Sequence, residues 1–157
     1  MSEMSDPARD RALAYIANCT DPAKLRQMAS NAGTAGQSEV QRQARLRLYS
    51  VAPAEKPGTL EHAVWQSILA LEDALSDESG KTKRLSRTRQ KIKRDGEAGT
   101  VRDLVLGKES AGFRMLVERD MVHLTFEAVA LRFRDRFDAE VLKAAGRKLE
   151  KVQTKPD

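Results

Sequence analysis

Three side chains in this sequence have the chemistry of common catalytic or metal-binding groups: His62, His123 and Cys19. The two histidines lie far apart in the chain and lack the HExxH spacing of a zinc-binding helix. Glu61 precedes His62 and would supply an acid–base pair, but adjacent helical positions do not face each other. We therefore interpret His62 as a solvated residue in the first turn of a helix. His123 falls in a loop between two apolar segments, and we interpret it as a packing or turn residue rather than a base.

Cys19 is expected near the C-terminal end of a helix, which does not lower a thiol pKa as a helix N-terminus does. We interpret it as a small buried hydrophobic residue rather than a nucleophile. Glycines flank the segment 107–112, but Glu109 within it would repel a phosphate. Carboxylates are dispersed along the chain, and a nuclease-type cluster would have to be assembled by the fold. The sequence thus predicts no enzyme, no metal site and no cofactor.

The strongest chemical signal is a run of positive charge between residues 81 and 94. Eight cations fall within these fourteen residues, and no acidic residue interrupts them. The chain has 28 basic and 23 acidic residues, for a net charge of +5. Outside the run, the acidic residues outnumber the basic ones, so the positive charge is concentrated in one element. The eight cations are Lys81, Lys83, Arg84, Arg87, Arg89, Lys91, Lys93 and Arg94.

Cations at steps of three and four lie on one face of a helix, so four of the eight are expected to contact one partner together. Leu85 and Ile92, seven residues apart, are expected to anchor the opposite edge of this helix. The other four cations are expected to flank the contact: Lys81, Lys83, Arg89 and Lys93. The central contacts are expected to be Arg84, Arg87, Lys91 and Arg94.

The run is typical of a phosphate-binding element, because each neutralised phosphate releases condensed counterions. Ser86, Thr88 and Gln90 add uncharged donors between the cations. The run contains no aromatic residue, so base stacking is not its mode, which favours duplex over single strand. Two alternatives remain. In the first, the segment docks on an acidic protein. In the second, it is a solvated surface helix whose charges pair with acidic residues upstream: Glu72, Asp73, Asp77 and Glu78.

The elements that must position this run are helical. Strand-type alternation is absent, and apolar residues recur at helical spacing, which predicts an all-α multi-helix bundle. Two prolines and a glycine make 53–58 a linker. We therefore expect an N-terminal three-helix unit over 1–52 and a C-terminal helical domain over 59–152. This domain contains a basic helix over 81–94, and residues 153–157 form a frayed tail.

Helix-capping residues mark several starts in the C-terminal domain. Thr59 precedes the most regular apolar stripe, and the pair Asp95-Gly96 is expected to end the basic helix.

Segments 100–106 and 113–118 fit the lengths of a helix-turn-helix, a weak signal because any two short helices around a glycine give it. An aromatic ligand pocket is an alternative to core packing for five residues: Trp65, Phe113, Phe126, Phe133 and Phe137. Ser110, Thr125 and Asp138 are candidate caps for the later helices.

The sequence also indicates a compartment. No apolar stretch approaches the roughly 20 residues that cross a bilayer. Met1 to Arg9 is polar and lacks the apolar core of a signal peptide. A single cysteine cannot form an internal disulfide, which favours a reducing compartment. We therefore expect a cytoplasmic protein with no membrane partner.

Several segments together resemble a group of small, uncharacterised helical proteins of alphaproteobacteria. These segments are 60–65 (LEHAVW), 86–92 (SRTRQKI), 112–116 (GFRML) and 124–129 (LTFEAV). The resemblance implies a bacterial cytosolic setting and carries no activity or site residue to this chain.

The sequence as a whole predicts a non-enzymatic nucleic-acid-binding protein, with duplex DNA favoured and a regulatory role compatible with it. The alternative is a protein–protein interaction module, an adaptor or inhibitor whose basic helix docks on an acidic partner. A homodimer that matches a two-fold DNA site is one arrangement compatible with the first interpretation.

Overall fold

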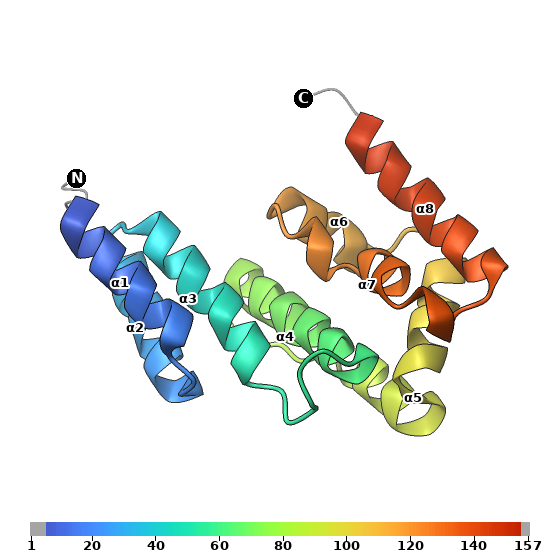
Figure 1. Cartoon of the computed structure of the whole chain (residues 1–157), viewed down its shortest axis with the longest axis horizontal. Coiled ribbons are helices and arrows are strands. Elements are labelled where there is room, and N and C mark those ends of the chain that lie inside the picture. Colours follow the sequence, from blue (N-terminus) through green and yellow to red (C-terminus); the bar gives the residue numbers. More distant parts are fainter. Residues whose placement is uncertain (1–5, 155–157) are drawn as a thin grey trace. The chain divides into compact units, whose positions relative to one another are not determined.

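The structure, a computed structural model, describes residues 6–154. Within them the chain forms eight α-helices and two short 3-10 helices, and no strand. The prediction of an all-α multi-helix fold is confirmed. The chain divides into two units, residues 1–54 and 55–157, with the division inside the proline- and glycine-containing linker (Figure 1). Each unit has its own hydrophobic core.

The N-terminal unit consists of α1 (Asp6–Asn18), α2 (Pro22–Thr34) and α3 (Ser38–Val51). Asp21 caps α2, because its carboxylate accepts a hydrogen bond of 3.0 Å from the N–H of Ala23. Small residues let α2 and α3 approach closely: Ala29 and Ala32 of α2 and Ala44 of α3 are all buried. Arg47 donates to the carbonyl of Cys19 at 2.9 Å, which ties α3 to the end of α1.

The C-terminal unit has its longest helices first: α4 (Leu60–Ser79) and α5 (Ser86–Leu106). Then follow α6 (Ala111–Glu118), the 3-10 helix η1 (Val122–Leu124), α7 (Phe126–Arg132), the 3-10 helix η2 (Arg134–Arg136) and α8 (Ala139–Thr154). Its core combines the apolar stripe of α4 with residues of α5, α7 and α8. Its fully buried members include Val64, Ile68, Val101, Val129 and Val141.

Side-chain caps begin four of these helices where the sequence predicts them. Thr59 accepts from the N–H of His62 at 3.2 Å, and Ser110 accepts from the N–H of Phe113 at 3.0 Å. Thr125 accepts from Ala128 at 3.1 Å, and Asp138 accepts from Val141 at 3.2 Å. These caps confirm the expected starts of α4, α6, α7 and α8.

Gly96 interrupts α5. Its φ of 81° and ψ of 169° are not helical, and this region of backbone space is essentially restricted to glycine. The chain changes direction there, so α5 consists of two helical halves joined at one residue (Figure 1). The first half contains the basic residues from Arg87 to Arg94, and the second half contributes Val101 and Val105 to the core.

Two predicted boundaries differ from the structure. Residues 81–85 are not helical, so the basic helix begins at Ser86 rather than at residue 81. At the C-terminus α8 continues through residue 154, where a frayed tail from 153 was expected, and residues 155–157 lie outside the described residues. Within the described residues, no helix is long and apolar enough to cross a bilayer.

Candidate nucleic-acid interface

The residues before α5 are fixed by side chains of α4 rather than by helical hydrogen bonds. Gly80, in the left-handed conformation, ends α4. After Gly80, every second backbone N–H donates a hydrogen bond to a side chain of α4. The N–H of Lys81 donates to Ser79 Oγ (3.1 Å), that of Lys83 to Ser76 Oγ (2.9 Å) and that of Leu85 to Glu72 Oε2 (2.8 Å). This alternation is typical of an extended segment, and it explains why Arg84 does not continue the helical stripe expected from the sequence.

Arg89 is half-buried and is held by contacts within the protein. Its guanidinium donates two hydrogen bonds of 2.7 Å to the carboxylate of Glu72, which is 8% exposed. It also lies over the ring of Trp65, 5.2 Å from the centroid, in a cation–π contact. The hydrogen bonds to Glu72 raise the pKa of Arg89. This pair corresponds to the upstream pairing considered as an alternative, and it makes Arg89 an anchor of the basic segment.

Removing the charge of Glu72 is expected to loosen that segment. Glu72→Gln weakens two charge-assisted hydrogen bonds, so we expect a loss of about 1.5–3 kcal/mol in the free energy of unfolding. Trp65, the chain's one tryptophan, reports unfolding of this unit by its fluorescence in urea. Hydrogen exchange of residues 81–89 should quicken in the variant. Glu118→Gln, at an exposed carboxylate on α6, is the control and should change neither quantity.

Lys91 is also occupied internally. Its ammonium donates to Asp95 at 2.8 Å and to Asp103 at 2.7 Å, so it bridges the two halves of α5 across Gly96. These contacts raise the pKa of Lys91 and lower the pKa values of both aspartates. The expectation that Lys91 is a central partner contact therefore conflicts with its geometry, because binding a phosphate would cost it two carboxylates.

Six of the eight cations remain at the surface. Five of these have no ion pair among the described residues, and Arg94, whose side chain is 68% exposed, pairs only with its neighbour Asp95. Arg87 and Arg94 are about two helical turns apart and so share a face, while Ile92 is buried on the other side. Leu85 packs against the core, as the sequence predicts. The five unpaired cations are Lys81, Lys83, Arg84, Arg87 and Lys93.

The sequence also raised two other arrangements for this unit, a helix-turn-helix and an aromatic ligand pocket. α6 packs mainly on α4 and η1, so it does not pair with the end of α5 as the second helix of a helix-turn-helix would. Phe113 is buried, and the remaining four aromatic residues pack against the core cluster. These four are Trp65, Phe126, Phe133 and Phe137.

The candidate reactive side chains take ordinary positions. Cys19 is buried, as expected. His62 is only 6% exposed, so the prediction of a solvated residue is wrong; it faces the core from the first turn of α4. His123 is exposed in η1, and its carbonyl accepts a hydrogen bond of 2.6 Å from Arg132. Among the described residues, no group of three or more histidine, cysteine or carboxylate side chains is placed to hold a metal ion.

Sequence reasoning missed a buried ion pair between α7 and α8. Lys148 donates to Glu127 Oε2 at 3.2 Å and to the carbonyl of Val105 at 2.8 Å, which caps the C-terminal end of α5 from another helix. Glu127 is 5% exposed, and its burial raises the pKa of its carboxyl group, although Lys148 opposes the shift. The one sequence signal was a glutamate among the apolar residues that begin α7.

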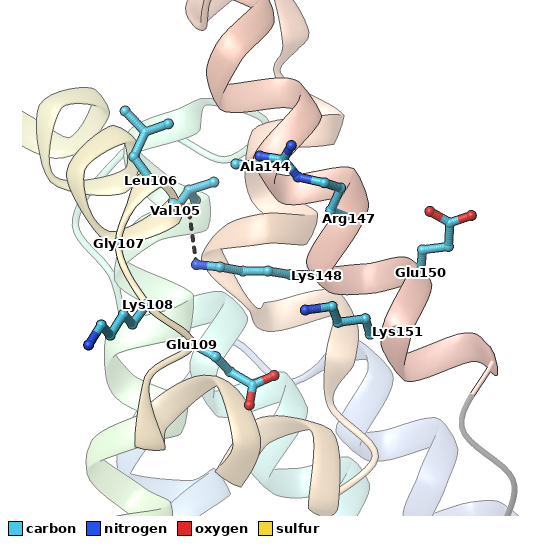
Figure 2. Close-up of a pocket in the computed structure, with 10 residues that line it drawn as sticks. All are labelled: Val105, Leu106, Gly107, Lys108, Glu109, Ala144, Arg147, Lys148, Glu150 and Lys151. Carbon is cyan, nitrogen blue, oxygen red and sulfur yellow. Dashed lines mark hydrogen bonds between the residues drawn. The ribbon is translucent and has the colours of Figure 1, made fainter.

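Lys148 crosses a groove of about 690 Å³ between α8 and the connection from α5 to α6. Figure 2 shows Lys148 and Lys151 extending from α8 toward this connection, while Glu150 points away from it. Lys108 and Arg147 add further positive charge around the groove, and Glu109 lies on its opposite wall. Because Lys148 is already engaged by Val105 and Glu127, we interpret this groove mainly as a packing contact between α8 and the end of α5.

No protein-family model, no curated protein and no solved structure matches this chain.

Proposed function

We propose that this protein is a non-enzymatic, cytosolic nucleic-acid-binding protein that contacts the phosphates of a duplex through the basic segment 81–94. One observation carries the proposal: six cations on one continuous stretch of chain are exposed, and within residues 6–154 none of them forms an ion pair with a carboxylate of another element. The proposed contacts are Lys81, Lys83, Arg84, Arg87, Lys93 and Arg94. Arg89 and Lys91 act instead as internal supports.

The support for a polyanion is electrostatic. Long-range attraction depends on charge that internal pairs do not cancel, and most acidic residues near the segment already have partners. Glu72 holds Arg89, and Asp95 and Asp103 hold Lys91. Asp77 and Glu78 both lie near Arg119. The exposed cations are therefore left for an external anion.

The support for a duplex is the absence of a stacking surface. Proteins that bind single strands stack bases on exposed aromatic rings. The basic segment has none, and the guanidinium of Arg89 covers one face of the nearby Trp65. Arginine forks and an exposed Gln90 between Arg87 and Arg94 suit contacts to phosphates and the groove edge.

The salt dependence of binding tests this proposal. Six phosphate contacts are expected to give a slope of about −5 for log affinity against log salt, from roughly −0.9 per contact. Fluorescence anisotropy of a labelled random-sequence duplex between about 50 and 200 mM salt measures it. A slope near zero, or no binding at the lowest salt, would overturn the proposal. Co-purification of one stoichiometric partner that survives nuclease treatment would favour the acidic-protein alternative.

A further inference from the structure

The C-terminal unit contains a second cavity that is separate from the groove in Figure 2. It has a volume of about 340 Å³ and lies among α4, the two ends of α5, α6 and the start of α7. Small-molecule sites span roughly 300–1,000 Å³, so the cavity is large enough for one small organic molecule. Its apolar walls include Leu71, Leu75, Leu85, Leu104, Phe113 and Phe126.

One of these apolar side chains also faces water. Leu104 lines the cavity from the C-terminal end of α5, and it is 36% exposed. An apolar molecule in the cavity would remove part of this side chain from water, which is favourable. Phe113 and Phe126 suit an aromatic ring, because rings gain from offset-stacked or edge-to-face contacts, and a rigid ring loses little entropy on binding. The walls therefore favour an occupant with a compact aromatic body.

Glu127 is the one charged residue among those that line the cavity. Its side chain is buried, and Lys148 donates to its Oε2 at 3.2 Å, so the charge of the carboxylate is already balanced. Within residues 6–154, no hydrogen bond from another residue reaches its Oε1. A negatively charged occupant would be repelled here, and a positively charged one would find no uncancelled charge, whereas a neutral hydroxyl can donate to a carboxylate oxygen.

The hydroxyl groups of the walls carry no charge, and two of them have partners within the protein. Ser110 accepts from the N–H of Phe113 at 3.0 Å, and Thr125 donates to the carbonyl of Val122 at 2.7 Å. The carboxylate of Glu127 is therefore the strongest hydrogen-bond acceptor among the side chains that line the cavity.

We propose that this cavity binds a small neutral phenol, whose ring lies among the leucine and phenylalanine side chains and whose hydroxyl donates to the Glu127 carboxylate. The proposal does not depend on the nucleic-acid interface, because none of the six proposed phosphate contacts lines the cavity.

Isothermal titration of the full chain with 4-ethylphenol, at neutral pH and without nucleic acid, tests the site directly. We expect saturable binding of one molecule. The methyl ether 4-ethylanisole has the same ring but no donor, so it should bind about tenfold more weakly for want of a hydrogen bond to a charged acceptor. The anion of 4-ethylbenzoic acid should bind more weakly still. No saturable binding at millimolar 4-ethylphenol would overturn the proposal, as would equal binding of the ether or of the anion.

A matched pair of variants locates the ligand. Leu104→Ala removes part of the apolar wall and should weaken 4-ethylphenol about fivefold. Leu106→Ala is the control, because Leu106 is similarly exposed, at 40%, and lines the groove in Figure 2 instead of this cavity. It should bind 4-ethylphenol as the unaltered chain does. Equal affinities in the two variants would place the ligand elsewhere and contradict the cavity assignment.

The role of Glu127 has its own test. The double variant Lys148→Met, Glu127→Gln keeps an acceptor of the same shape at residue 127 but removes both members of the ion pair, so no buried charge is left alone. Its preference for 4-ethylphenol over 4-ethylanisole should fall to about threefold, because a hydrogen bond to a neutral acceptor is weaker. An unchanged preference, in a variant whose fold circular dichroism verifies, would show that the hydroxyl does not donate to Glu127.

Discussion

Glutamine at four exposed cations of the basic segment is expected to lower duplex affinity on the order of 10³-fold at about 0.1 M salt, and to reduce the salt slope by about 3.6. Each substitution removes one phosphate contact and the counterion release that accompanies it. The four side chains have no internal ion pair among the described residues, so the fold should remain intact. They are Lys83, Arg84, Arg87 and Lys93.

A matched control separates local contacts from net charge. It also replaces two lysines and two arginines with glutamine, at exposed positions that are not part of the basic segment: Lys24, Arg26, Arg134 and Lys143. Both variants have the same net charge, yet the control should retain nearly all of the duplex affinity. If both lose affinity equally, attraction to the whole protein rather than to the basic segment explains binding, and the assigned interface is wrong. Circular dichroism verifies the fold of each.

Lys148→Met is expected to lower the stability of the C-terminal unit by about 3–5 kcal/mol at neutral pH. Methionine retains much of the hydrocarbon chain but leaves the buried Glu127 carboxylate without its cation. It also removes the donor that caps the carbonyl of Val105. Urea unfolding followed by Trp65 fluorescence measures the loss. Lys143→Met, an exposed lysine on the same helix, should change stability by less than about 0.5 kcal/mol.

The effect of Lys148→Met should depend on pH in a defined direction. Burial already raises the pKa of Glu127 above its ordinary value of 4.5, and loss of Lys148 should raise it further. A carboxyl group whose pKa is raised by folding favours the folded state at low pH and loses that contribution as pH rises through the folded pKa. The variant should therefore be least destabilised near pH 4.5 and progressively more so toward neutral pH.

A double variant tests whether the missing cation is the cause. Lys148→Met combined with Glu127→Gln has no buried charge, so it should be more stable at neutral pH than Lys148→Met alone and should lack the added pH dependence. If the single and double variants lose the same stability at every pH, the ion pair contributes little, and the lost cap on α5 would account for the whole effect.

The sequence predicted the features of this fold that depend on local chemistry. Thr59, Ser110 and Thr125 cap helices because a hydroxyl before an apolar stripe meets free N–H groups wherever the rest of the chain lies. Gly80 ends α4 for a similarly local reason, since it accepts the left-handed conformation. The apolar spacing of α4 likewise follows from one helical period, and it marks the core correctly.

Other features depend on contacts between segments that sequence spacing does not encode. The path of residues 81–85 is set by Ser76, Ser79 and Glu72, whose hydrogen bonds compete with continued helix. The eight cations are a second example. The density of positive charge in the sequence marks the segment, but only the folded structure shows that Arg89 and Lys91 have internal partners while the other six cations are exposed. The pairing of Glu127 with Lys148 joins residues 21 positions apart on different helices.

Gly96 has a consequence for the phase of the helix that contains the basic residues. In an uninterrupted helix, Ile92 and Val101 would lie about two and a half turns apart and so face opposite directions, yet both are buried. Arg94 and Val101, about two turns apart, would face the same way, and the guanidinium would point into the core. The backbone rotation at Gly96 resets this phase, so that one half of α5 turns its charges outward while the other half turns its valines inward. A single glycine thereby reconciles two sequence patterns that no straight helix could satisfy together.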